Sequence, residues 1–96
     1  MNNVQLLEMS KQQSISKRGM WQVILHDDHN SIDHVIDCLL EICGHNYIQS
    51  VQCATIAHNT KQCSIFTDSY EECVEVQQEL EDYGLTSTIS KYKKHV

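Results

Sequence analysis

The sequence predicts a small α+β sandwich, in which a three-stranded antiparallel sheet carries three helices on one face. Two observations support this fold class. The apolar patterns follow the order β-α-α-β-α-β, and the 96 residues, 41 % of them hydrophobic, can build only one core. We expect a core domain over residues 20–90, a flexible N-terminal arm at 1–19 and a polar tail at 91–96.

The first strand is predicted over Trp21 to Leu25, where both faces carry apolar residues, as in a central strand. A helix follows from about Ser31, with Asn30 or Ser31 as its cap and Gly44 as its stop. Its apolar stripe repeats at helical period and consists of Ile32, Val35, Ile36, Leu39, Leu40 and Cys43.

A second helix is predicted from about Asn46 to Ala57 or His58, with one face made of Tyr47, Val51, Ala54 and His58. A short strand at Cys63 to Phe66 comes next. Asp68 and Glu71 have the spacing of a capping box for the third helix. The stripe of that helix is Tyr70, Cys73, Val74, Gln77, Leu80 and Tyr83, and a last strand runs from Leu85 to Ser90.

Composition argues against several classes of function. A net charge of −6 argues against nucleic-acid binding, and no apolar run has the roughly 18 residues of a membrane span. Glycine-rich phosphate loops and signal-peptide patterns are lacking. Five cysteines without a CxxC pair indicate buried, reduced thiols and a cytoplasmic protein.

Four ionisable side chains, His26 to His29, lie where the first strand passes into the first helix. Asp28 is suited to cap the helix, whereas Asp27 could face outward and bind an ammonium group. Alternatively, His26 and His29 could form a metal site with either aspartate. His58, at the end of the second helix, has by default a favourable interaction with the helix dipole.

These features together resemble the ClpS family of adaptors for Clp proteases. The resemblance covers about residues 20–90 and rests on VILHDDHNSIDHVID, on a helix ending in Ala57-His58, and on the strand CSIFT. It implies a protein that is not an enzyme and needs no cofactor. Such an adaptor binds substrate proteins through a free N-terminal Leu, Phe, Tyr or Trp and passes them to a Clp AAA+ unfoldase.

Carried over by position, the resemblance implies that Asp27 and His58 hold the substrate's ammonium, with His26 at the place of the family's Asn. Asn30 would contact the peptide backbone. The apolar pocket would be lined by Ile32, Val35, Ala54, Ala57 and Leu85. Because Ala54 and Ala57 are small, we expect a roomier pocket that favours Phe, Tyr or Trp over Leu.

The implied partner is an unfoldase of the ClpA or ClpC type, engaged through the N-terminal arm by a monomeric adaptor in the bacterial cytoplasm. Ser69 and Val74 depart from the Glu and Lys that are frequent on the family's third helix. Two other interpretations remain at this stage. One is a small metal-dependent enzyme built on His26, Asp27, His29 and His58; the other is the ribosomal stalk domain, which shares the architecture without the paired aspartates and closing histidine.

Overall fold

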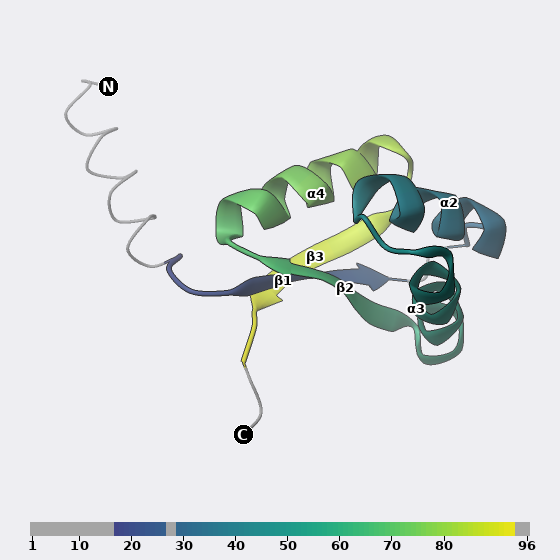
Figure 1. The fold of residues 1–96 in the computed structure, drawn as a ribbon, viewed down its shortest axis with the longest axis horizontal. Helices are drawn as coiled ribbons and strands as arrows, with labels where there is room; N and C mark the ends of the chain where they lie inside the picture. The colour runs from purple at the N-terminus through teal and green to yellow at the C-terminus, as the bar shows by residue number, and fades with distance from the viewer. Residues whose placement is uncertain (1–16, 27–28, 94–96) are drawn as a thin grey trace.

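The computed structural model describes residues 17–26 and 29–93. Within these ranges the chain forms three strands and three helices in the predicted β-α-α-β-α-β order, so the predicted α+β fold is confirmed (Figure 1). The elements are β1 (Trp21–His26), α2 (Ile32–Ile42), α3 (Tyr47–Thr60), β2 (Gln62–Asp68), α4 (Tyr70–Asp82) and β3 (Thr86–Lys91). Residues 1–16 of the predicted arm, the loop residues Asp27 and Asp28, and residues 94–96 of the tail lie outside the described residues.

The sheet has the strand order β2-β1-β3, and β1 is antiparallel to both neighbours. The predicted central position of β1 is therefore confirmed. Its last residue, His26, pairs with Gln62 of β2 and Thr86 of β3, so one end of the sheet brings together the loop after β1 and the start of β3. The β1–β2 register shifts between Val23 and Ile24.

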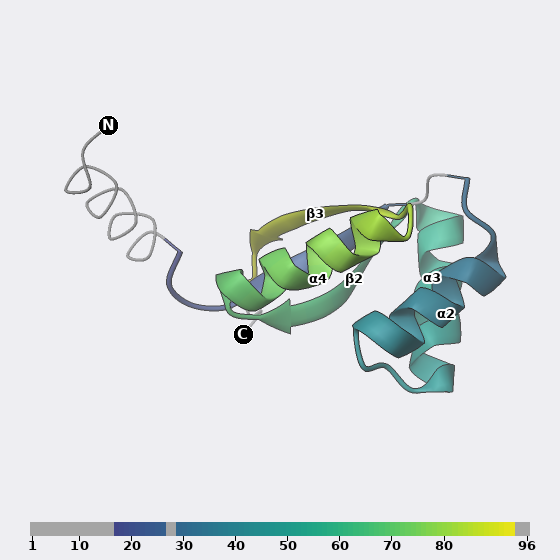
Figure 2. The ribbon, with the colours of Figure 1, turned by 90° about the horizontal axis from the view of Figure 1, so that it is seen from above.

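The helices form one side of the core. Figure 2 shows α4 lying across the sheet, while α2 and α3 pack together beside it. Val23 and Leu25 of β1 point into this core because alternate residues of a strand share a face. The buried cluster consists of Val23, Leu25, Cys38, Leu39, Ala57, Ile65, Cys73, Val76, Leu80 and Leu85.

Helix α2 begins as predicted. The Ser31 side chain caps it by accepting a hydrogen bond from the His34 backbone N–H, and Gly44 beyond its end has a left-handed φ of 69°. Ile36, Cys38 and Leu39 are buried, whereas Ile32, the first residue of the helix, is 41 % exposed. This exposure places Ile32 at the mouth of the pocket described below.

The face that helix α3 presents to the core agrees with the predicted one at Ala54 but not at Tyr47 or His58. Its buried residues are Ser50, Ala54 and Ala57, and Tyr47 is 65 % exposed. The helix starts with a capping box between Asn46 and Gln49, and it extends to Thr60. The prediction that it ends at residue 57 or 58 was wrong, because Lys61, with φ 76°, serves as the left-handed stop without being a glycine.

The predicted capping box of α4 was also wrong. The N-cap is Ser69, whose hydroxyl accepts a hydrogen bond from the Glu72 N–H, while the Asp68 carboxylate accepts from the Ser69 N–H. The buried stripe contains Cys73, Val76 and Leu80. Val76 thus takes the core position that was predicted for Val74, and Tyr83 is 52 % exposed.

In the part of the chain that the structure describes, no helix combines the length and apolar character needed to cross a membrane.

Candidate functional site

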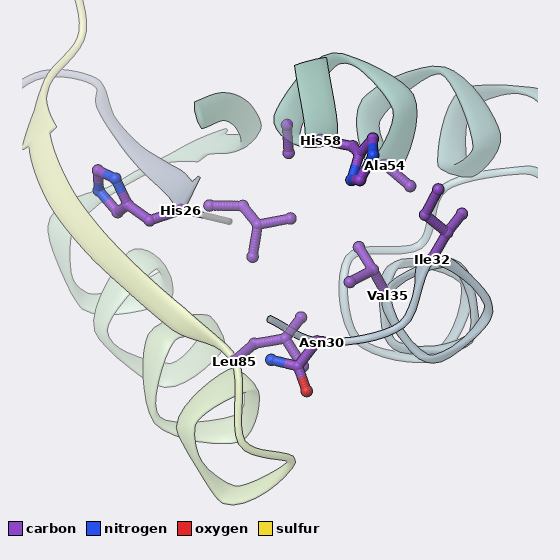
Figure 3. A pocket seen from close by; sticks show the side chains of 9 residues that line it. His26, Asn30, Ile32, Val35, Ala54, His58 and Leu85 are labelled. Atoms are coloured by element: carbon purple, nitrogen blue, oxygen red, sulfur yellow. The ribbon is translucent and has the colours of Figure 1, made fainter. Parts of the chain in front are cut away.

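A pocket lies where the end of β1, the start of α2, the end of α3 and the start of β3 meet (Figure 3). Short connections bring these four chain segments together at one end of the sheet, a usual location for binding groups. The lining residues are Leu25, His26, Asn30, Ile32, Val35, Ala54, Ala57, His58 and Leu85.

Eight residues that the sequence singled out therefore surround one hollow: His26, Asn30, Ile32, Val35, Ala54, Ala57, His58 and Leu85. The ninth, Asp27, lies outside the described residues. Leu25 also lines the pocket, although the predicted set did not include it. Its alternation with Val23 in β1 was the signal that could have identified it, since the last inward residue of a strand lies beside the loop that follows.

The floor of the pocket is apolar and well buried. Leu25 and Leu85 are each 2 % exposed, and Ala54 and Ala57 are each 3 % exposed. Ile32 and Val35 approach the hollow from α2, opposite Leu85 (Figure 3). Such a floor suits an apolar side chain, because its burial removes apolar surface from water.

The pocket is narrow as it stands. Its cavity volume is ≈ 10 Å³, about the room that one water molecule needs. A large side chain can therefore enter only if the walls separate. Ile32 is the wall residue with the freedom to move, since it is the most exposed of the apolar residues around the hollow.

The position of Leu85 follows from the turn between α4 and β3. The Leu85 N–H donates to the Leu80 carbonyl and the Gly84 N–H to the Glu81 carbonyl, both at 2.9 Å. With Gly84 at φ 83°, these two bonds form a Schellman motif. The motif directs Leu85 back onto the buried Leu80, and so to the pocket floor.

The polar side chains lie around the rim. His58 is exposed and lies in the last turn of α3. The ring of His26 lies beside β3, on the other side of the hollow from His58, and its Nε2 is 2.8 Å from the Thr88 hydroxyl (Figure 3). Asn30 Nδ2 donates to the Gly84 carbonyl at 2.9 Å.

His29 does not line the pocket. It is exposed, and its φ of 77° lies in the left-handed region that non-glycine residues rarely adopt. Among residues 17–26 and 29–93, no three His, Cys, Asp or Glu side chains are grouped so that they could hold a metal ion.

All five cysteines are free thiols. Cys43, Cys53 and Cys63, which come from the end of α2, from α3 and from β2, pack against the core. Burial, reinforced by Cys53, raises the pKa of the Cys43 thiol from 9.0 to about 12. Burial and the neighbouring Cys53 also raise the pKa of Cys63. The Cys43 and Cys63 thiols therefore stay protonated at neutral pH, which makes them weak nucleophiles.

Comparison with protein families gives a match over most of the chain. Residues 16–88, well over half of the chain, match the family model described as ATP-dependent Clp protease adaptor protein ClpS. The chain belongs to the ClpS family. ClpS proteins are adaptors of the Clp protease and not proteases themselves, and they work with Clp chaperones and substrates. A search of curated proteins found no match to this chain.

Proposed function

We propose that this ClpS-family protein binds substrate proteins through a free, bulky hydrophobic N-terminal residue and delivers them to a Clp AAA+ unfoldase. The observation that carries the proposal is the pocket itself. It combines a floor of four buried apolar residues with a polar rim, and all of its lining residues except Leu25 are ones to which the family pattern assigns these roles.

The chemistry of an N-terminal residue fits this arrangement. Its side chain would be buried against Leu25, Ala54 and Leu85, and its ammonium would lie at the rim near His58. A neutral imidazole accepts a hydrogen bond from an ammonium, and the Asp27 carboxylate would add charge. Asn30, which also lines the pocket, would contact the peptide backbone.

Side-chain preference follows from the small residues of α3. Ala54 and Ala57 leave space for a ring once Ile32 moves aside, so we expect Phe, Tyr and Trp to bind more tightly than Leu. The partner would be an unfoldase of the ClpA or ClpC type in the bacterial cytoplasm, reached through the N-terminal arm of a monomeric adaptor.

A panel of fluorescent peptides that differ only in their first residue tests the proposal. We expect Phe, Tyr and Trp peptides to bind, Leu peptides to bind more weakly, and peptides that begin with Ala or Asp not to bind measurably. If the Leu peptide binds at least as tightly as the Phe peptide, the predicted preference is wrong. If the first residue makes no difference, the proposed function is wrong.

The rival function is a metal-dependent enzyme built on His26, Asp27, His29 and His58. His29 lies away from the pocket lining, and the ring of His26 is bonded to Thr88, which weakens this alternative. Metal content of the purified protein separates the two functions. Stoichiometric zinc together with absent peptide binding would favour the enzyme over the adaptor.

A further inference from the structure

Two side chains bind the turn that connects α4 to β3, one from just before α2 and one from its first turn. Asn30 Nδ2 donates to the Gly84 carbonyl at 2.9 Å. His34 Nε2 lies 2.7 Å from the Tyr83 carbonyl. Because a carbonyl can only accept, this nitrogen carries the hydrogen and donates it. We name these two hydrogen bonds the turn clamp.

The turn clamp supplies hydrogen-bond donors for two backbone carbonyls of the turn. The Schellman motif pairs the N–H groups of Gly84 and Leu85 with carbonyls of α4. The motif does not use the carbonyls of Tyr83 and Gly84, and these are the two that His34 and Asn30 bind. The N–H groups of the turn are thereby bound by α4, and its carbonyls are bound by Asn30 and His34.

The turn clamp links opposite walls of the pocket. Leu85 follows the clamped turn directly and forms the side of the floor next to β3, whereas Ile32 and Val35 line the opposite side from the same helix as His34. Movement of the turn away from α2 would therefore widen the hollow and carry Leu85 with it. His34 itself does not line the pocket, so it can act on a ligand only through the turn.

We propose that His34 is a positioning residue, which holds Leu85 at the correct distance from α2 for an N-terminal side chain to contact both walls. The inference rests on the proposed function, because it concerns the ligand of the same pocket.

The test compares H34A with H34Q, whose amide can donate in place of the imidazole. We expect H34A to bind the Phe peptide about fivefold more weakly, as the loss of one hydrogen bond implies, mainly through faster dissociation. H34Q should bind within about twofold of the wild type. In an L85A background, the effect of H34A should disappear, because the clamped residue no longer reaches the ligand.

H45A is the matched control. The His45 Nε2 also bonds a backbone carbonyl, that of Ile65 in β2, and His45 lies outside the pocket lining. This variant removes an equivalent bond, so it should lower stability without weakening peptide binding. Wild-type affinity in H34A, or equal weakening in H34A, H34Q and H45A, would overturn the positioning role.

Hydrogen exchange of the protein alone separates this inference from the proposed function. The Leu85 amide, bonded to the Leu80 carbonyl, should exchange about fivefold faster in H34A but not in H34Q. Unchanged exchange would overturn the turn clamp even if peptides bind. Wild-type protein that binds no peptide would overturn the proposed function and the ligand-positioning role together, while faster exchange in H34A would still establish the clamp.

Discussion

His26 is the residue at which this chain departs from the pattern of the ClpS family. Its ring is not directed at the pocket, because Nε2 lies 2.8 Å from the Thr88 hydroxyl of the neighbouring strand (Figure 3). An imidazole held there must give up that bond before it can reach a ligand ammonium. We infer that Asp27 and His58 carry most of the ammonium recognition in this protein.

An asparagine at position 26 should therefore strengthen binding. In H26N the shorter amide side chain would offer its oxygen to the ammonium, and we expect about threefold to tenfold tighter binding of the Phe peptide by isothermal titration calorimetry. T88V serves as the control, because it frees His26 without adding an amide. Equal or weaker binding by H26N, or an equal gain in T88V, would contradict this role.

The sequence allowed the pocket residues to be predicted, but not the orientation of each polar side chain. Ile32, Val35, Ala54 and Leu85 were assigned to the pocket by their resemblance to the ClpS pattern, and in the structure they surround one hollow. The partners of His26 and His34, however, are 62 and 49 residues away in the chain. No local pattern encodes such a contact, so the turn clamp became visible only in the folded protein.

At the scale of the elements, we expect α3 to determine how large a side chain the pocket can accept. Its buried face carries only Ser50, Ala54 and Ala57, and two of these line the hollow. The cavity beside these small residues has a volume of ≈ 10 Å³. Any bulk added on this face must occupy space that the ligand would need.

The A54V variant tests this role of α3. Two added methyl groups at a residue that is 3 % exposed would fill the hollow. We expect about tenfold weaker binding of the Phe peptide and a smaller loss for the Leu peptide. T55V, an exposed neighbour on the same helix, is the control. Unchanged Phe binding in A54V would show that the ligand does not approach α3.

The thiols between α2, α3 and β2 make stability depend on pH. The pKa of Cys43 is raised from 9.0 to about 12, so the folded state keeps its proton in a range where the unfolded state loses it. Unfolding is then favoured as pH rises from 9 towards 12, and the stabilising effect is fully present only below pH 9.

Urea unfolding at about pH 8 and about pH 11 checks this dependence. The urea concentration at the midpoint of wild-type unfolding should fall with rising pH. The fall should be smaller in C43A/C63A, which lacks two of the thiols with a raised pKa. An equal fall in both proteins would mean that other groups cause it. Slow alkylation of the folded protein at neutral pH is a second expected result.

The helix caps show why element boundaries were harder to predict than element types. Asp68 and Ser69 are adjacent and both suit an N-cap, so the choice of Ser69 depended on how α4 packs on the sheet. Val74 and Val76 are likewise both apolar and could each have faced the core, and in the structure Val76 is the buried one. In contrast, the order and type of the elements follow from long apolar periods and agreed with the structure.

For the whole molecule, we expect binding and delivery to be separable. The described chain starts at Lys17, whose Nζ lies 4.9 Å from the Trp21 ring and 4.7 Å from the Tyr70 ring. Trp21 Nε1 also donates to the Lys17 carbonyl at 3.0 Å. These contacts anchor residue 17 beside Trp21, at the end of β1 opposite to His26 and the pocket.

Removal of residues 1–16 should therefore leave Phe-peptide affinity within about twofold of the wild type. If the arm engages the unfoldase, the same truncation should abolish degradation of a substrate with N-terminal Phe by the Clp protease. The rate at which this substrate is degraded is measured with and without the truncated adaptor. Undiminished degradation would show that the arm is not needed for delivery.

The most direct test is a comparison of two Phe peptides that differ only in an acetyl group on the N-terminus. Acetylation removes the positive charge and leaves the amide with a single N–H, while the aromatic side chain stays the same. If the rim recognises the ammonium, the acetylated peptide should bind at least about 100-fold more weakly by calorimetry. Equal affinity for the two peptides would contradict recognition of a free N-terminus.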